Sequence, residues 1–77
     1  MKVFPNPAKD FIFIKSEEHE GVSLIIISDI IGNKITSIGN ITQNPIKVNT
    51  STLSKGVYLI QLFMSENRSF TKRLIIE

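Results

Sequence analysis

The 77-residue sequence contains no cysteine and no tryptophan, and it has a single histidine. Without cysteine the chain can form neither a disulfide nor a thiolate metal site. It also lacks a glycine-rich phosphate loop, a Ser/His/Asp set and paired carboxylates suited to acid–base work. His19 lies among Glu17, Glu18 and Glu20, and we interpret this segment as a solvated loop, because adjacent residues cannot all converge on one ion. We therefore expect no catalytic residue, no metal ligand and no cofactor.

Long apolar runs and a strong charge bias are also missing. No stretch approaches the roughly 18 apolar residues of a membrane-spanning helix, and no apolar segment follows Met1 and Lys2 as in a secretory signal peptide. The formal net charge is only +2, and the basic residues are scattered rather than clustered, which disfavours nucleic-acid binding. If the protein acts outside the cell, its export signal lies elsewhere, so we expect this chain to be a segment of a larger protein.

Helical periodicity is absent, whereas β-branched and aromatic residues alternate with polar ones in short runs. The pattern predicts strands at residues 11–15, 22–29, 34–38, 46–48, 57–64 and 69–76, with a seventh if residues 2–4 pair. Turn residues separate these runs, as in all-β sandwiches. We predict an all-β fold, an antiparallel immunoglobulin-like β-sandwich of six to seven strands.

Individual residues suggest structural roles within this fold. Gly32-Asn33 between two strand-like runs predicts a hairpin with a two-residue primed turn, and Asp29 is expected to accept backbone hydrogen bonds beside it. Tyr58, shortly after Gly56, is typical of a tyrosine corner, in which the hydroxyl bonds an upstream backbone group. The run 24–27 is apolar on both pleat faces, which predicts a central strand that is covered on both sides or abuts a partner.

Four segments, taken together and in this order, resemble a known family. Residues 3–10 contain Pro5-Asn6-Pro7 and are similar to a Tyr-Pro-Asn-Pro motif in which Phe4 replaces the tyrosine. Residues 27–35 match aliphatic-x-Asp-aliphatic-x-Gly-x-x-aliphatic, residues 53–60 match Leu-x-x-Gly-x-Tyr, and residues 71–76 are basic and then aliphatic. These motifs resemble the type A C-terminal sorting domains of the bacterial type IX secretion system.

The resemblance implies that residues 1–77 form a single C-terminal sorting domain. Such a domain is not an enzyme; it is a signal that directs its parent protein across the outer membrane of a Gram-negative bacterium. The implied partners are the outer-membrane secretion machinery and a sortase-like cysteine protease that removes the domain. The cargo is then anchored to the cell surface or released, so the implied location is secreted or cell-surface.

The resemblance also places the decisive signal at the C-terminal end. The residues expected to contact the secretion machinery are Lys72, Arg73, Leu74, Ile75, Ile76 and Glu77. An edge strand there offers unpaired backbone groups for strand addition; the alternative is that its charges only oppose aggregation. The remaining motif residues are expected to be mainly structural, namely Pro5, Asn6, Pro7, Asp29, Gly32, Leu53, Gly56 and Tyr58.

Two other functions remain open from the sequence. One is a non-catalytic carbohydrate- or protein-binding sandwich module on an extracellular enzyme, which the lack of tryptophan and the single tyrosine disfavour. The other is an inert spacer or adhesion domain. Weak self-association is also plausible, because an apolar central strand and an exposed terminal strand both favour edge pairing.

Overall fold

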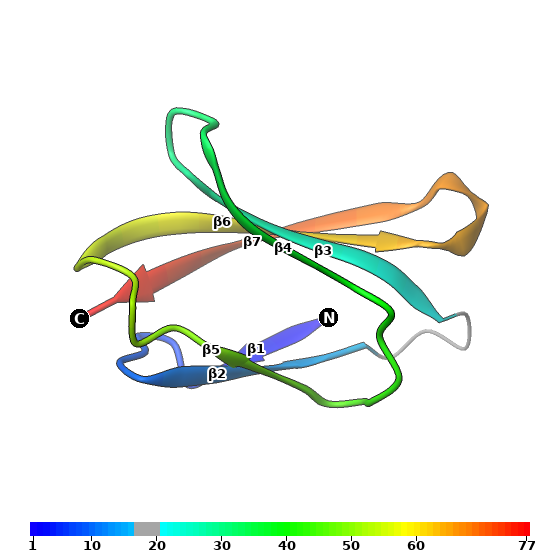
Figure 1. Cartoon of the computed structure of the whole chain (residues 1–77), viewed down its shortest axis with the longest axis horizontal. Coiled ribbons are helices and arrows are strands. Elements are labelled where there is room, and N and C mark those ends of the chain that lie inside the picture. Colours follow the sequence, from blue (N-terminus) through cyan, green and yellow to red (C-terminus); the bar gives the residue numbers. More distant parts are fainter. Residues whose placement is uncertain (17–20) are drawn as a thin grey trace.

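The computed structural model describes residues 1–16 and 21–77. The chain folds into two antiparallel sheets that face each other (Figure 1). The three-stranded sheet has the order β1-β2-β5, formed by Lys2–Phe4, Phe11–Lys15 and Ile46–Asn49. The four-stranded sheet has the order β4-β3-β6-β7, formed by Lys34–Gly39, Val22–Asp29, Gly56–Met64 and Ser69–Ile76. The predicted all-β sandwich is confirmed, and residues 2–4 supply the seventh strand.

Alternating side chains from both sheets build the core. In β2, Ile12 and Ile14 are fully buried while Phe11 and Lys15 face outwards, and the same period of two runs through β5 and β6. The mainly aliphatic core fits a small domain without disulfides that relies on apolar burial. The core consists of Ala8, Ile12, Ile14, Ile25, Ile27, Ile46, Val48, Tyr58, Ile60, Leu62, Met64, Leu74 and Ile76.

The central strand β3 is apolar on both faces, as the sequence indicated, but the two faces differ in surroundings. Ile25 and Ile27 point into the core with no exposed surface, whereas Leu24 and Ile26 lie on the outer face and are half-buried. Within the described residues the domain has only two layers (Figure 1), so no third layer covers this outer face.

The β3–β4 hairpin is confirmed, but the expected two-residue Gly-Asn turn is wrong. The Gly32 amide donates to the Asp29 carbonyl at 3.1 Å, and the Asp29 amide donates to the Asn33 carbonyl at 2.9 Å. The loop is therefore Ile30-Ile31-Gly32, a three-residue turn in which Gly32 takes the positive φ of 96°. The cause is Asp29, whose Oδ1 accepts from the Ile31 and Asn33 amides. Asn33 therefore pairs with Asp29, and the loop ends at Gly32, one residue before the predicted end.

The predicted tyrosine corner is also present. The segment after β5 crosses from one sheet to the other and leads into β6 at Gly56. The Tyr58 hydroxyl donates to the Ser54 carbonyl at 2.6 Å, four residues upstream. Gly56 has a φ of 156°, a conformation that side chains with a Cβ rarely adopt. This corner fixes the start of the strand that pairs with β7.

Candidate functional site: the terminal strand and the Pro-Asn-Pro segment

The terminal strand β7 is the outermost strand of the four-stranded sheet. It pairs with β6 along its whole length, from Gly56 opposite Ile76 to Phe63 opposite Ser69. On its other side the described residues form no further strand, but the segment between β1 and β2 lies against its C-terminal half. The two ends of the described chain therefore form one structural unit.

Asn6 makes the first contact between this segment and β7. Its Nδ2 donates to the Arg73 carbonyl at 3.0 Å, and its Oδ1 accepts from the Ile75 amide at 3.0 Å. A side-chain amide carries one donor and one acceptor in the geometry of a peptide group. Asn6 thus takes the place that a neighbouring strand's backbone would occupy along β7.

Ala8 continues the contact through its own backbone. The Ala8 amide donates to the Ile75 carbonyl at 2.8 Å, and the Ala8 carbonyl accepts from the Glu77 amide at 2.9 Å. Ala8 forms a parallel bridge with Ile76, and its methyl group is buried in the core, 1% exposed. A larger side chain at this position would displace the segment from the strand.

Only part of the β7 edge is covered in this way. Because the backbone groups of an antiparallel strand alternate between its two neighbours, the contacts to Arg73, Ile75 and Glu77 show that the odd-numbered residues face the rim. The rim groups of Ser69 and Thr71 have no paired strand. The open edge thus runs from Ser69 to the amide of Arg73, and the covered edge runs from the Arg73 carbonyl to Glu77.

The six residues predicted to contact the secretion machinery divide into two groups. Leu74 and Ile76 are 0% and 3% exposed and belong to the core. Lys72, Arg73, Ile75 and Glu77 are exposed. Both side chains are buried because alternate residues of the strand face the core. Their side chains therefore cannot touch a partner directly, and they contribute by stabilising the fold.

Lys72 has an unusual place on β7. It belongs to the same pleat face as Leu74 and Ile76, which point into the core, yet Lys72 itself is exposed. An inward-facing charge on an edge strand is a common device against edge-to-edge pairing. The anti-aggregation role considered from the sequence is therefore compatible with its position.

The Pro5-Asn6-Pro7 segment lies between β1 and β2. β1 precedes it and pairs with β2, so the segment connects these two strands and lies over β7. Sequence reasoning missed the contact of Asn6 with β7. A polar side chain between two prolines is a weak signal for such a contact, because nothing in the local sequence identifies its distant partner.

Asp29 carries the clearest electrostatic feature among the remaining motif residues. Its carboxylate accepts from the Asn33 amide at 2.8 Å, the Ile31 amide at 3.0 Å and the Asn33 Nδ2 at 3.0 Å. These bonds, the Asn33 amide foremost, favour the charged form and lower the pKa of Asp29 from its usual value of 3.8. The arrangement shapes the turn, which agrees with the structural role predicted for Asp29 and Gly32.

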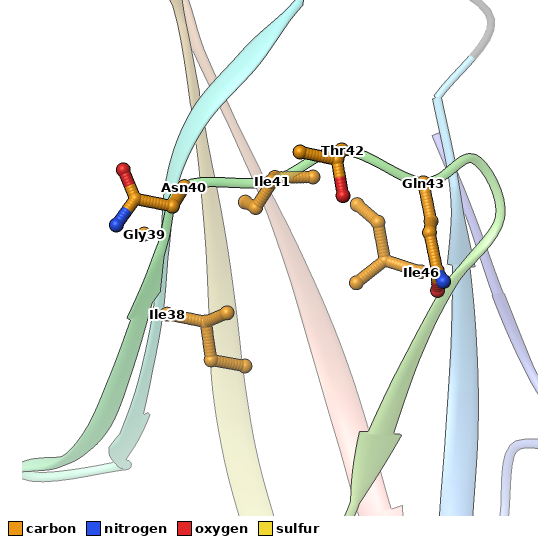
Figure 2. Close-up of a pocket in the computed structure, with 7 residues that line it drawn as sticks. All are labelled: Ile38, Gly39, Asn40, Ile41, Thr42, Gln43 and Ile46. Atoms are coloured by element: carbon orange, nitrogen blue, oxygen red, sulfur yellow. The ribbon is translucent and has the colours of Figure 1, made fainter.

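A shallow pocket lies at the β4–β5 connection (Figure 2). It has a volume of about 150 Å³ and is lined by Ile38, Gly39, Asn40, Ile41, Thr42, Gln43 and Ile46. No titratable side chain lines it, so its lining supplies no general acid or base.

Other sites considered from the sequence can be placed only in part. Within residues 1–16 and 21–77, no group of three His, Cys, Asp or Glu side chains could hold a metal ion. Glu17, Glu18, His19 and Glu20 lie outside the described residues. Among the described residues, no helix is long and apolar enough to cross a membrane.

Comparison with known proteins identifies the family. A family model described as "Secretion system C-terminal sorting domain" matches residues 2–77. The chain belongs to this family of type IX secretion sorting domains. The family resemblance seen in the sequence motifs is confirmed, and the terminal strand with its Pro-Asn-Pro contact is a feature of this sorting domain.

A curated relative of the sorting domain is an endo-acting ulvan lyase from Formosa agariphila. The two are 36% identical over 80 residues, which covers 100% of this chain and 15% of the lyase. The chain thus spans a small part of the length of its relative. No solved structure matches the sorting domain.

Proposed function

We propose that this sorting domain is the non-catalytic signal that directs its parent protein across the outer membrane through the type IX secretion machinery. The membership of residues 2–77 in the sorting-domain family is the observation that carries the proposal. The parent protein is then secreted or held at the cell surface of a Bacteroidetes-type bacterium. A sortase-like cysteine protease removes the domain after export, and the cargo is anchored or released.

The machinery is proposed to recognise the terminal strand. The exposed side chains of Lys72, Arg73, Ile75 and Glu77 form one part of the recognition surface. The open edge from Ser69 to the Arg73 amide forms the other, because unpaired backbone groups accept an additional strand from a partner. The similarity to a lyase of which the chain covers only 15% supports a signal attached to a larger cargo.

Deleting the last residues is a poor test of this proposal, because Leu74 and Ile76 belong to the core and their loss would unfold the domain. A sharper variant is Thr71→Pro. The Thr71 amide faces the rim and makes no bond to β6, and proline is tolerated at such edge positions. The substitution removes a donor from the open edge and obstructs an incoming strand.

Ser37→Pro provides a matched control at the opposite edge of the same sheet. Thr71, Gln61, Ile26 and Ser37 lie in one cross-strand row, and the alternation of bonded and non-bonded pairs along this row directs the Ser37 amide to the β4 rim. Both variants therefore lose one rim amide without losing a bond between strands. Circular dichroism of each purified variant verifies that the sandwich is retained.

The assay is export of a fluorescent cargo fused upstream of the domain in a bacterium that has a type IX system. We expect the complete domain and Ser37→Pro to export the cargo, and Thr71→Pro to retain it in the periplasm. Equal export by both proline variants would contradict recognition at the open edge. Undiminished export of a cargo that lacks all 77 residues would contradict the signal function itself.

A further inference from the structure

The outer face of the three-stranded sheet has a composition that the sorting function does not explain. Its side chains alternate with the core residues of β1, β2 and β5, and Figure 1 shows no described element covering this side of the sheet. Apart from Asn49, the face is formed by three aromatic and three basic side chains, namely Phe4, Phe11, Phe13, Lys2, Lys15 and Lys47. We call it the aromatic–lysine face.

The three phenylalanines form a continuous apolar cluster. The ring centroids of Phe4 and Phe13 are 5.7 Å apart, and those of Phe11 and Phe13 are 5.5 Å apart with the rings edge to face. Phe4 and Phe11 nevertheless remain 41% and 40% exposed. The cluster thus leaves large apolar side chains in water in a chain that has only five phenylalanines.

Among the residues that the structure describes, the lysines of this face have no acidic partner. Lys2 lies directly opposite Lys15 in the β1–β2 register, an arrangement of like charges that is unfavourable in a sheet. The Lys47 ammonium lies 4.9 Å above the centre of the Phe11 ring, a cation–π contact. None of the three forms an ion pair in the part of the chain that the structure describes, and no residue of β1, β2 or β5 is acidic.

We propose that the aromatic–lysine face docks on the surface of an anionic lipid bilayer. Lysines near such a surface are attracted by its negative potential, and phospholipid phosphates between Lys2 and Lys15 would relieve their mutual repulsion. Exposed phenylalanine side chains gain free energy by entering the boundary between headgroups and acyl chains. The long lysine side chains allow the ammonium groups to stay at the headgroups while the rings enter more deeply.

A bilayer explains this face better than a charged polysaccharide does. Stacking on a sugar requires a free, flat ring face, but Lys47 covers a face of Phe11, and Phe13 packs against both other rings, edge to face with Phe11 and tilted by 30° to Phe4. The strands supply one neutral hydrogen-bonding side chain on this side, Asn49. Binding to lipid needs no such directional groups. The inference is independent of the secretion signal and involves a different surface.

The first test is co-sedimentation of the 77-residue chain with vesicles of phosphatidylcholine that contain phosphatidylglycerol. Lys2→Gln/Lys15→Gln is compared with Lys34→Gln/Lys55→Gln, whose lysines lie on β4 and in the β5–β6 connection. Each double variant lowers the net charge from +2 by two units to 0. At roughly fivefold per lysine, we expect the face variant to bind about 25-fold more weakly and the control to bind like the parent.

The second test uses the absence of tryptophan from the chain. Phe4→Trp places a single fluorophore on the aromatic–lysine face, and Phe63→Trp places one on the outer face of the other sheet. We expect phosphatidylglycerol vesicles to shift the emission of Phe4→Trp to shorter wavelength and to leave that of Phe63→Trp unchanged. Pure phosphatidylcholine vesicles should shift neither.

Three results would overturn the inference. Equal losses in the two lysine variants would mean that net charge, rather than this face, governs binding. An emission shift at Phe63 instead of Phe4 would place the contact on the other sheet. Binding to heparin or to an acidic protein without binding to vesicles would assign the face to another class of partner. Thermal unfolding of each variant verifies that the comparison concerns folded protein.

Discussion

The Asn6 side chain accepts a hydrogen bond from the Ile75 amide at 3.0 Å across 69 positions of sequence. Together with the bond to the Arg73 carbonyl, this contact divides the β7 edge into a covered half and an open half. The Pro-Asn-Pro motif and the C-terminal motif of the sorting domain therefore act as one element. A change in either motif is expected to alter the other.

Asn6→Ala should weaken this contact with limited effect on the rest of the fold. The variant loses two hydrogen bonds at an exposed site, so we expect a loss of about 1 kcal/mol in the free energy of unfolding. The Ile75 amide should exchange with solvent faster, as measured by NMR. Asn6→Asp is the matched variant, because it keeps the acceptor for Ile75 and lacks the donor for Arg73. Unchanged protection of Ile75 in Asn6→Ala would contradict the contact.

Tyr58→Phe removes the hydroxyl that donates to the Ser54 carbonyl at 2.6 Å and leaves the buried ring in place. The loss of one such hydrogen bond should lower the free energy of unfolding by about 1 kcal/mol. Urea denaturation measures this as a lower midpoint with an unchanged slope. A midpoint equal to that of the parent would show that the tyrosine corner contributes nothing to stability.

Leu74→Ala and Ile75→Ala compare adjacent residues on opposite faces of β7. Leu74 is 0% exposed, so its truncation should cost about 2–5 kcal/mol, enough to unfold much of a domain of this size. Ile75 is 37% exposed, and its truncation should cost about 1 kcal/mol or less. Thermal unfolding by circular dichroism measures both, and similar losses in the two variants would contradict the assigned strand orientation.

Asp29 should make the β3–β4 hairpin sensitive to acid. Its pKa is lowered in the folded domain by the bonds from Asn33 and Ile31, so the ionised carboxylate stabilises the folded state above the usual pKa of 3.8. That contribution is lost as the pH falls through the lowered pKa. We expect Asp29→Asn to lower the midpoint of thermal unfolding at neutral pH and to differ less from the parent in acid. A difference that does not change with pH would contradict this role.

Strand positions were largely predictable because the period of two is a local property of the chain. Phe11–Lys15, Val22–Asp29 and Ser69–Ile76 have the predicted bounds, and the predicted roles of Asp29 and Tyr58 in turns depend on contacts within four residues. The predicted Gly-Asn turn was wrong because the Asp29 carboxylate competes for the loop amides and lengthens the turn by one residue.

The residue pattern alone was enough to locate the strands and to show the motifs that resemble the family. The folded structure was needed to show that Asn6 and Ala8 cover half of β7, and that Phe4 joins Phe11 and Phe13 beside three lysines that form no ion pair within residues 1–16 and 21–77. The physical reason is the range of the interactions. Side-chain alternation and turn bonds act over a few residues, whereas these contacts join segments that meet only when the two sheets close over a shared core.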